Sequence, residues 1–345
     1  MNLFKRFFTL LLLVCLAGTA FALEFKGDGS QGGAFASRLN ADNDLANIVD
    51  FPKKFIAGFG DASIFTSHGA TQRSFNDYKT FAFTVGPMIG FRVPGKPKDA
   101  VDDLQNADTI LKHDGDMSFG ANAQLITGQI GINGKFLLEN LNLGLRFGYF
   151  SIPLNGLDDM NVNFKSFHLG AVADYRIVKG ADLGVIKWRG LTVGTGLLYQ
   201  KTTLDCGFIQ EDFREQVSGD WYIARSPSMN FNMSIRTFTI PAEISTSVLL
   251  LKFLNIGVGA GVDFAFGSND TSINLSTRIE KEVGGADGGS VWLTGGGAAN
   301  VKFFNPKVMA DVGLKLGPVV LDVPITYYFG SDSGVSLGVT LGIVF

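Results

Sequence analysis

Histidine is the side chain best suited to proton transfer and metal binding near neutral pH, and this chain contains three. His68, His113 and His168 lie far apart in the sequence. No two of them have the His-x-x-Glu-His spacing that places two zinc ligands on one face of a helix. The sequence therefore predicts neither a metal site nor a cofactor.

Two glycine-rich runs invite comparison with loops that bind phosphate groups. Neither Gly257–Gly261 nor Gly295–Gly297 ends in Gly-Lys-Ser or Gly-Lys-Thr, and neither leads from a strand pattern into a helix pattern. Nothing in the sequence assembles a nucleophile, a base and an orienting group. We therefore expect that the protein is not an enzyme.

A set of ionisable residues has a more informative arrangement. Each lies in a segment where apolar residues alternate with small or polar ones, and each falls opposite the apolar face, because successive side chains of a strand point to opposite sides. Such residues either pair across a closed interior or line a wet channel. The predicted lumen-facing residues are Arg92, Arg146, His168, Asp174, Arg176, Glu243, Asp263, Asp311, Lys315 and Asp322.

Alternating segments recur from residue 54 to the end, separated by turn residues. They predict an all-β fold, a closed antiparallel transmembrane barrel. Since single-chain bacterial barrels normally have an even number of strands, we expect about 12 strands, with about 10 and about 14 as the alternatives. The eleven recognisable segments are Phe55–Phe59, Phe81–Val93, Phe119–Leu138, Leu141–Tyr149, Phe167–Ile177, Leu191–Tyr199, Met229–Leu250, Ile256–Phe266, Val308–Leu316, Leu321–Phe329 and Val335–Phe345.

Two segments change the parity of their apolar residues partway along, as one extra residue in a strand would cause. We therefore predict bulges near Thr127–Gln129 and near Arg236–Thr237. Pro87 cannot donate a ladder hydrogen bond, so it should also mark a bulge or an edge-like position.

The composition fits a membrane barrel better than a disordered or nucleic-acid-binding chain. Glycine is abundant at 44 residues, phenylalanine numbers 31, and proline only 10. Lumen-facing small residues and lipid-facing apolar residues give such a balance, and the inward glycines favour a passage. The formal net charge of −3 gives no field that attracts nucleic acid.

Residues 1–22 are expected to be a cleaved secretory signal peptide. Lys5 and Arg6 precede an apolar centre, and Ala20-Phe21-Ala22 has the small-x-small pattern of a cleavage site. Lipid attachment at Cys15 is a less favoured alternative. After residue 22 no stretch approaches the about 20 apolar residues of a membrane helix, so a mature chain that spans a bilayer must do so as a closed barrel.

Residues 23–52 do not alternate and are expected to form an irregular or plug-like segment ahead of the barrel of residues 53–345. Gly33-Ala34-Phe35-Ala36 and Ala41-Asp42-Asn43-Asp44 resemble the plug of the FadL-like transporter family, although the Asn-Pro pair expected in that family is missing and Phe51-Pro52 stands nearby instead. The resemblance implies a plug in the barrel mouth and uptake of hydrophobic compounds.

The last eleven residues have the clearest alternation. Apolar residues occupy the odd positions from Val335 to Phe345, and small or polar residues occupy the even positions up to Gly342. This ending resembles the porin-like, bacterial outer-membrane β-barrel class. The resemblance implies contact with outer-membrane lipid in a Gram-negative type of envelope, and recognition of the final strand and Phe345 by the barrel-assembly machinery.

Connection lengths predict an orientation, because outer-membrane barrels have short periplasmic turns and longer extracellular loops. The short connections are Glu139–Asn140, Lys252–Leu254 and Gly317–Pro318, and the long ones are Pro94–Asp116, Thr203–Pro227 and Ser268–Phe304. Counted back from a final strand that runs inward, the long connections all fall on the outer side.

Three functions remain open from the sequence. The first is a channel or transporter for passive uptake of small molecules, with the solute unknown. The second is FadL-like uptake of hydrophobic compounds. The third is a structural or surface-adhesion barrel without transport.

Overall fold

The computed structural model describes residues 24–40, 51–69, 78–94, 120–157, 160–209, 212–330 and 332–345. The predictions for the signal peptide, Cys15 and His113 lie outside these residues, as does most of the connection that follows Pro94. Within the described chain, no helix is both long enough and apolar enough to span a membrane.

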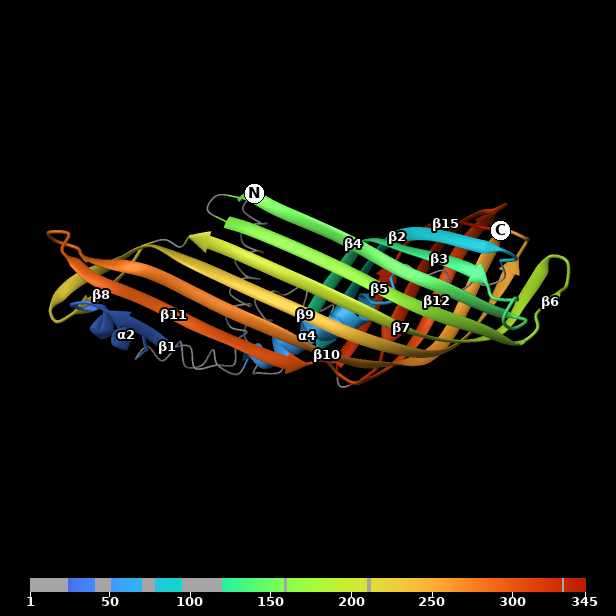
Figure 1. Cartoon of the computed structure of the whole chain (residues 1–345), viewed down its shortest axis with the longest axis horizontal. Helices are drawn as coiled ribbons and strands as arrows, with labels where there is room; N and C mark the ends of the chain where they lie inside the picture. Colours follow the sequence, from blue (N-terminus) through green and yellow to red (C-terminus); the bar gives the residue numbers. More distant parts are fainter. Residues whose placement is uncertain are drawn as a thin grey trace.

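Ten antiparallel strands form a ring (Figure 1). The last of them is split into β14 and β15, which pair with β13 on one side and with β2 on the other, so the ring returns to its first strand. The ring strands are β2 (Phe81–Pro94), β3 (Gly120–Asn133), β4 (Leu141–Leu157), β5 (Met160–Val178), β7 (Ile186–Ile209), β9 (Asp220–Leu250), β10 (Leu254–Lys281), β12 (Phe304–Leu316), β13 (Val319–Tyr328), β14 (Asp332–Gly338) and β15 (Thr340–Val344).

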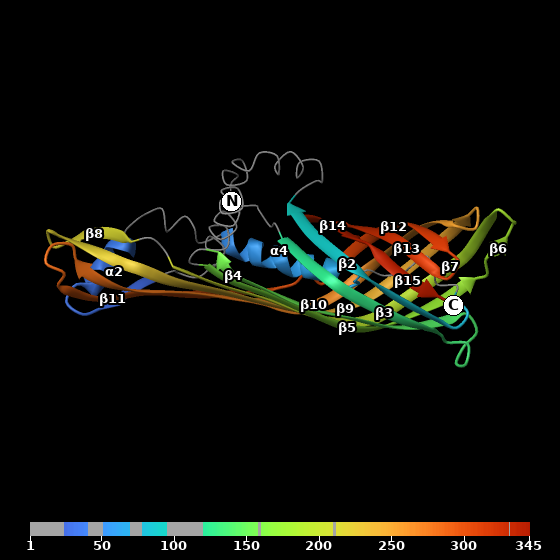
Figure 2. The same ribbon diagram turned by 90° about the horizontal axis from the view of Figure 1, so that it is seen from above.

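The predicted all-β barrel class is confirmed, and ten strands lie at the lower end of the expected range. One predicted strand is wrong: Phe55–Phe59 belongs to a helix, α4 (Phe51–Thr66), which crosses the expected boundary between residues 52 and 53. Figure 2 shows α4 entering the ring from the end opposite the C-terminus. It contacts the ring strands β2, β3, β7, β9, β10 and β14, and also β11 (Asp287–Asn300), which is not a ring strand.

The irregularity predicted around residue 127 is present. The register of β2 and β3 shifts between Gly86 and Met88, where Pro87 lies opposite the extra residues Leu125 and Ile126. Pro87 therefore marks a bulge, as its missing N–H group led us to expect.

The second predicted bulge is wrong. β9 keeps one continuous register with β10 through Arg236 and Thr237. Odd-numbered side chains of β9 point inward all the way from Met229 to Leu249. The apolar residues of β9 lie on this inward face before residue 236, but on the outward face from Phe238 onward. The apolar residues change faces because the surroundings of the strand change, with no change in its backbone.

This change marks the end of an apolar belt around the ring. Exposed Phe, Ile, Leu and Val side chains cover its outer face on strands that are neighbours in register. Such a belt is the surface that a membrane barrel presents to lipid. Its members include Phe83, Leu145, Phe147, Leu169, Leu197, Phe238, Ile240, Ile244, Ile256, Val258, Val312, Leu321, Ile325, Leu341 and Ile343.

Beyond the belt, β4, β5, β7, β9 and β10 continue as an open sheet, which we call the extension (Figure 1). β9 has 31 residues, whereas a transmembrane strand needs about 9 to 11. β11 (Asp287–Asn300) pairs with the far half of β10, and β8 (Phe213–Val217) pairs with the start of β9. The segments Thr203–Pro227 and Ser268–Phe304, predicted as long loops, are therefore mostly strands.

The inner face of the extension has its own apolar core. Phe231, Met233, Ile273 and Leu275 lie in one buried cluster, which also reaches Phe59 of α4. These side chains point inward from strands whose outward positions are polar, so the alternation is the reverse of that in the belt.

The N-terminal elements cover part of this core. β1 (Glu24–Asp28) pairs with β11, and α2 (Gly32–Asn40) buries Phe35 against β8, β9 and β11. The Asn40 side-chain amide donates to the Phe25 carbonyl and accepts from the Phe25 N–H, both at 2.9 Å. Asn40 thus satisfies a peptide group on the outer edge of β1, which limits pairing with another chain.

Candidate functional site inside the ring

The candidate site is built around the second half of α4. Every residue from Gly58 to Gly69 is buried. A helix enclosed on all sides shows no single apolar face, which explains why the sequence pattern around Phe55 and Phe59 resembles a strand. In the described chain, α4 occupies the interior of the ring.

Glycines on the wall bring the helix close to the strands. A Cβ atom on Gly120 of β3 would overlap the Gly58 carbonyl, and one on Gly334 of β14 would overlap the Phe65 ring. Phe65 also stacks on Tyr328 of β13, with ring centroids 4.1 Å apart. These inward glycines accommodate α4, so they do not by themselves indicate an open passage.

Asp61 ties the middle of α4 to the wall. Its carboxylate forms an ion pair with Arg92 of β2 at 2.5 Å and accepts a hydrogen bond from the Lys302 backbone N–H at 3.0 Å. Both side chains of the pair are almost fully shielded from solvent. Because an enclosed carboxylate needs such partners, the pair helps to fix the helix along its axis.

A hydroxyl and amide network lines the wall opposite these contacts. Gln200 of β7 donates to the Thr66 hydroxyl at 3.2 Å. Thr202 links to Ser166 at 3.0 Å, and Gln124 donates to Ser166 at 2.6 Å. The polar end of α4 thus meets polar groups of three strands.

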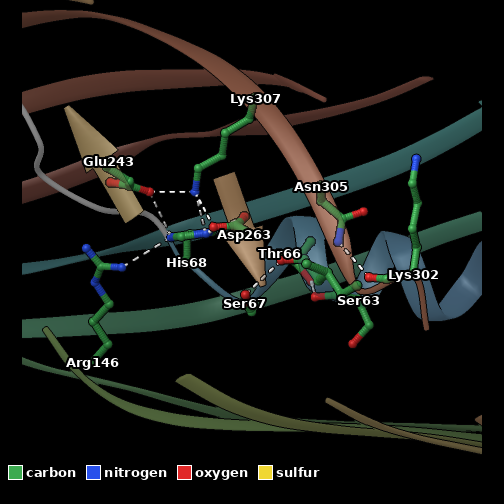
Figure 3. A network of polar contacts seen from close by, with 11 residues as sticks. Ser63, Thr66, Ser67, His68, Arg146, Glu243, Asp263, Lys302, Asn305 and Lys307 are labelled. Atoms are coloured by element: carbon green, nitrogen blue, oxygen red, sulfur yellow. Dashed lines mark hydrogen bonds and ion pairs between the residues drawn. The ribbon is translucent and has the colours of Figure 1, made fainter. Parts of the chain in front are cut away.

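The densest contacts surround His68, just beyond the C-terminal end of α4 (Figure 3). Nε2 of His68 lies 2.9 Å from Asp263 Oδ2 of β10. The Lys307 ammonium of β12 donates to Asp263 at 2.6 Å and to Glu243 of β9 at 2.5 Å. Arg146 of β4 approaches His68 Nδ1 at 3.4 Å. Charged side chains from four strands of the ring therefore surround the His68 imidazole.

The partners of His68 indicate its tautomer. Arg146 can only donate, so Nδ1 accepts, and Nε2 carries the hydrogen that is donated to Asp263. Nε2 also lies 2.9 Å from the Lys307 ammonium, but a Nε2 that accepted from this ammonium could not donate to the Asp263 carboxylate, which can only accept. With a neutral His68, the two cations Lys307 and Arg146 balance the two anions Glu243 and Asp263. We call these five residues the latch.

The latch has the donor set of a metal site but not the space for a metal. Ligand atoms of His68, Glu243 and Asp263 all lie within 4.8 Å of one another. The Lys307 nitrogen lies 2.9 Å or less from all three residues, so an ammonium ion already holds the position that a cation would take. The geometry is that of a buried salt-bridge network.

The structure brings three of the predicted lumen-facing residues, Arg146, Glu243 and Asp263, into the latch. Arg92 instead pairs with Asp61. The remaining predicted residues do not join the latch. His168, Asp311 and Asp322 are buried, whereas Asp174, Arg176 and Lys315 are partly buried.

Sequence reasoning missed Lys307, His68 and Asp61 as members of the site. Lys307 has the same odd parity as Asp311 and Lys315 and lies just before the predicted start of its strand, so extending that pattern would have found it. His68 and Asp61 gave no comparable signal, because α4 was not predicted.

One Gly-x-Ser-x-Gly match occurs, from Gly334 to Gly338. In α/β-hydrolases this motif forms a sharp turn between a strand and a helix that exposes the serine. Here it lies within β14, which pairs on both sides, and Ser336 is buried. The match therefore has no catalytic geometry.

Several solved structures resemble this chain at low sequence identity. The translocator domain of the autotransporter NalP from Neisseria meningitidis is 9% identical, with 84% of this chain and 100% of that chain covered and a TM-score of 0.35. The outer membrane protease OmpT from Escherichia coli is 9% identical, with 80% and 99% covered and a TM-score of 0.37. A FadL homologue from Pseudomonas aeruginosa is 9% identical, with 84% and 98% covered and a TM-score of 0.29.

No curated protein matches this chain. The family model described as Lsa36-like matches residues 20–345, which is nearly the whole sequence. The chain therefore belongs to the Lsa36-like family.

Proposed function

We propose that this protein resides in the outer membrane, closed at rest by α4, and presents its extension outside the membrane as an interaction surface. The observation that carries the proposal is the change of outer-face chemistry along β9 and β10. Phe238, Ile240 and Ile244 are exposed in the belt, whereas Asn230 and Asn232 occupy the same outward row farther along β9.

The neighbouring strand changes in the same way. Ile256, Val258 and Phe266 face outward in the belt, whereas the outward positions from 270 to 280 are occupied by Asp, Ser, Asn, Ser, Arg and Glu in turn. Asn232 donates to Ser272 at 3.5 Å across this face. A surface of amides and hydroxyls suits contact with water and polar partners and does not suit lipid. We therefore place the edge of the membrane near residues 236 and 268.

The orientation follows from the two ends of the ring. The short turns Leu251–Phe253 and Gly317–Pro318 lie at the end that carries the C-terminus, and the extension lies at the other end (Figure 1). Barrels of this class place short turns in the periplasm. Under this proposal the extension lies outside the cell, and the solute-channel function becomes a minor or gated one.

Cysteine labelling of intact cells tests this orientation. Val283, at the tip between β10 and β11, is 80% exposed, whereas native Cys206 is buried. We expect a membrane-impermeant maleimide to label Val283→Cys on whole cells. Lys252→Cys, in a short turn at the other end, should be labelled only after lysis. The reverse result, or labelling of both variants in intact cells, would contradict the proposed orientation.

FadL-like uptake of hydrophobic compounds is the second candidate. It is favoured by a separation between the neighbouring strands β3 and β4, which we call the fork. Pairing of β3 with β4 stops at Thr127 and Gly148, while β4 continues to pair with β5 as far as Leu157. In the described residues, the β3-facing edge of β4 has no strand partner beyond this point. Ile126, on the bulge beside the fork, is 59% exposed.

Probe uptake into liposomes tests the second candidate. Ile126→Asn should slow entry of a hydrophobic fluorescent probe by severalfold if the fork is the route, because a polar side chain would then stand at its rim. Val258→Asn is the matched control, since Val258 is similarly exposed on β10, which β5, β7 and β9 separate from β4. Equal uptake by both variants and the wild type would remove this candidate.

A further inference from the structure

A small cavity lies at the turn end of the ring, away from both the extension and the latch. Its volume is about 190 Å³. The connection between β3 and β4 forms one side, the residues just before β2 form another, and Arg176 of β5 completes it. The lining residues are Tyr78, Lys79, Asn133, Lys135, Glu139, Asn140, Asn142 and Arg176.

The lining is electropositive. Lys79, Lys135 and Arg176 carry three positive charges against the single negative charge of Glu139. Glu139 itself lies 4.0 Å from the Lys179 ammonium on the protein surface. Asp174, which pairs with Asn142 in the β4–β5 register, is a second carboxylate nearby but not in the lining. The C-terminal carboxylate of Phe345 accepts from the Thr80 N–H at 2.8 Å and is a third anion beside Lys79. With Lys179 counted, four cations stand against these three carboxylates, so an excess of one positive charge remains.

The two lysines are available to a ligand. Both side chains are exposed, and within the described part of the chain neither ammonium has an ion-pair partner. Each ammonium offers three donors, and the Asn140 side-chain amide offers two more. Cationic donors at several angles around one cavity suit a carboxylate or a phosphate group.

The backbone holds this lining in place. Asn140 adopts a left-handed conformation with φ of 66°, and its carbonyl accepts from the Arg176 N–H at 3.1 Å. The Asn133 side chain donates to the Tyr78 carbonyl at 3.1 Å and accepts from the Lys135 N–H at 2.9 Å. The turn, the segment before β2 and strand β5 are therefore connected by hydrogen bonds around the cavity.

We propose that this cavity is a binding site for a small anionic group, a carboxylate or a phosphate. Its size supports a small group, because pockets that enclose drug-sized molecules measure about 300 to 1,000 Å³. This site is independent of the proposed surface function, since it lies at the opposite end of the molecule. An anion bound there would connect the β3–β4 turn to Tyr78 and Lys79, just before β2.

Titration of the refolded, ¹⁵N-labelled full chain tests the site. Inorganic phosphate and N-acetylalanine serve as separate probes, so that the phosphate and carboxylate alternatives are distinguished. We expect saturable shifts of the Lys135, Asn140 and Arg176 amide signals with at least one probe. Lys79→Gln/Lys135→Gln should weaken that binding by about tenfold or more, because two charge-assisted contacts are lost.

Lys252→Gln is the matched control, because it removes an exposed lysine from another turn at the same end of the ring. It should bind each probe as the wild type does. Since all three lysines are exposed, these substitutions should leave the fold intact, which heat-modifiable gel migration verifies. Non-saturating shifts with both probes, or equal weakening by the control, would overturn the proposal.

Discussion

Replacement of Lys307 by alanine is expected to destabilise the folded barrel by about 3 to 5 kcal/mol, the usual cost of breaking a buried ion pair by removing one partner. The Lys307 ammonium is fully buried and donates to Glu243 and Asp263. Without it, the latch would hold two carboxylates against the single guanidinium of Arg146. Urea unfolding of the refolded protein in detergent, followed by gel migration without heating, measures the loss.

A charge-balanced double variant separates this effect from simple loss of packing. Glu243→Gln/Lys307→Ala leaves Asp263 opposite Arg146, so the net charge of the latch returns to zero. It should recover a large part of the lost free energy of unfolding, because matched removal of a buried pair costs far less than removal of one partner. If the double variant is less stable than Lys307→Ala, charge balance does not control the stability of the latch.

The same substitution should create a metal site. Lys307→Ala vacates the position between the ligand atoms of His68, Glu243 and Asp263, which is a nitrogen and oxygen donor set that suits Zn²⁺. Zinc at about 100 times its dissociation constant would add about 2.7 kcal/mol to the stability of the variant. The wild type, with its ammonium in place, should not respond to zinc.

The barrel could be predicted from the sequence because its wall depends on a local rule. Alternation over Leu141–Tyr149 or Val335–Phe345 is produced by lipid on one side and a more polar interior on the other. The rule fails where the surroundings change. The odd-numbered residues from Met229 to Ile235 point inward to an apolar core of the extension. Their parity therefore predicts a bulge at Arg236–Thr237 that the structure does not contain.

The candidate site was less predictable because it depends on contacts between distant residues. Alternation predicts Arg146, Glu243 and Asp263 opposite the apolar face, but which charges meet depends on the strand register. His68 reaches Asp263 across 195 positions of the sequence. A helix enclosed by a ring has no apolar stripe, so neither α4 nor the polar contacts of Asp61 and His68 gave a periodic signal in the sequence.

A single methyl group on Gly120 is expected to loosen α4 and open the ring to ions. The Cβ of Gly120→Ala would overlap the backbone carbonyl of Gly58, and a backbone group cannot rotate away as a side chain can. Overpacking of this kind costs about 1 to 3 kcal/mol, which would weaken the position of the helix. In planar bilayers we expect no steady current from the wild type and frequent openings from Gly120→Ala.

Gly207→Ala provides the control for this experiment. It also adds a methyl group to a strand glycine, but the new Cβ would meet only the Asn230 side-chain oxygen, at 3.1 Å, and that side chain is exposed. Its current should match that of the wild type. A steady wild-type current would contradict the closed lumen and favour a passive channel, whereas a closed Gly120→Ala variant of normal stability would show that the contact with Gly58 does not hold α4 in place.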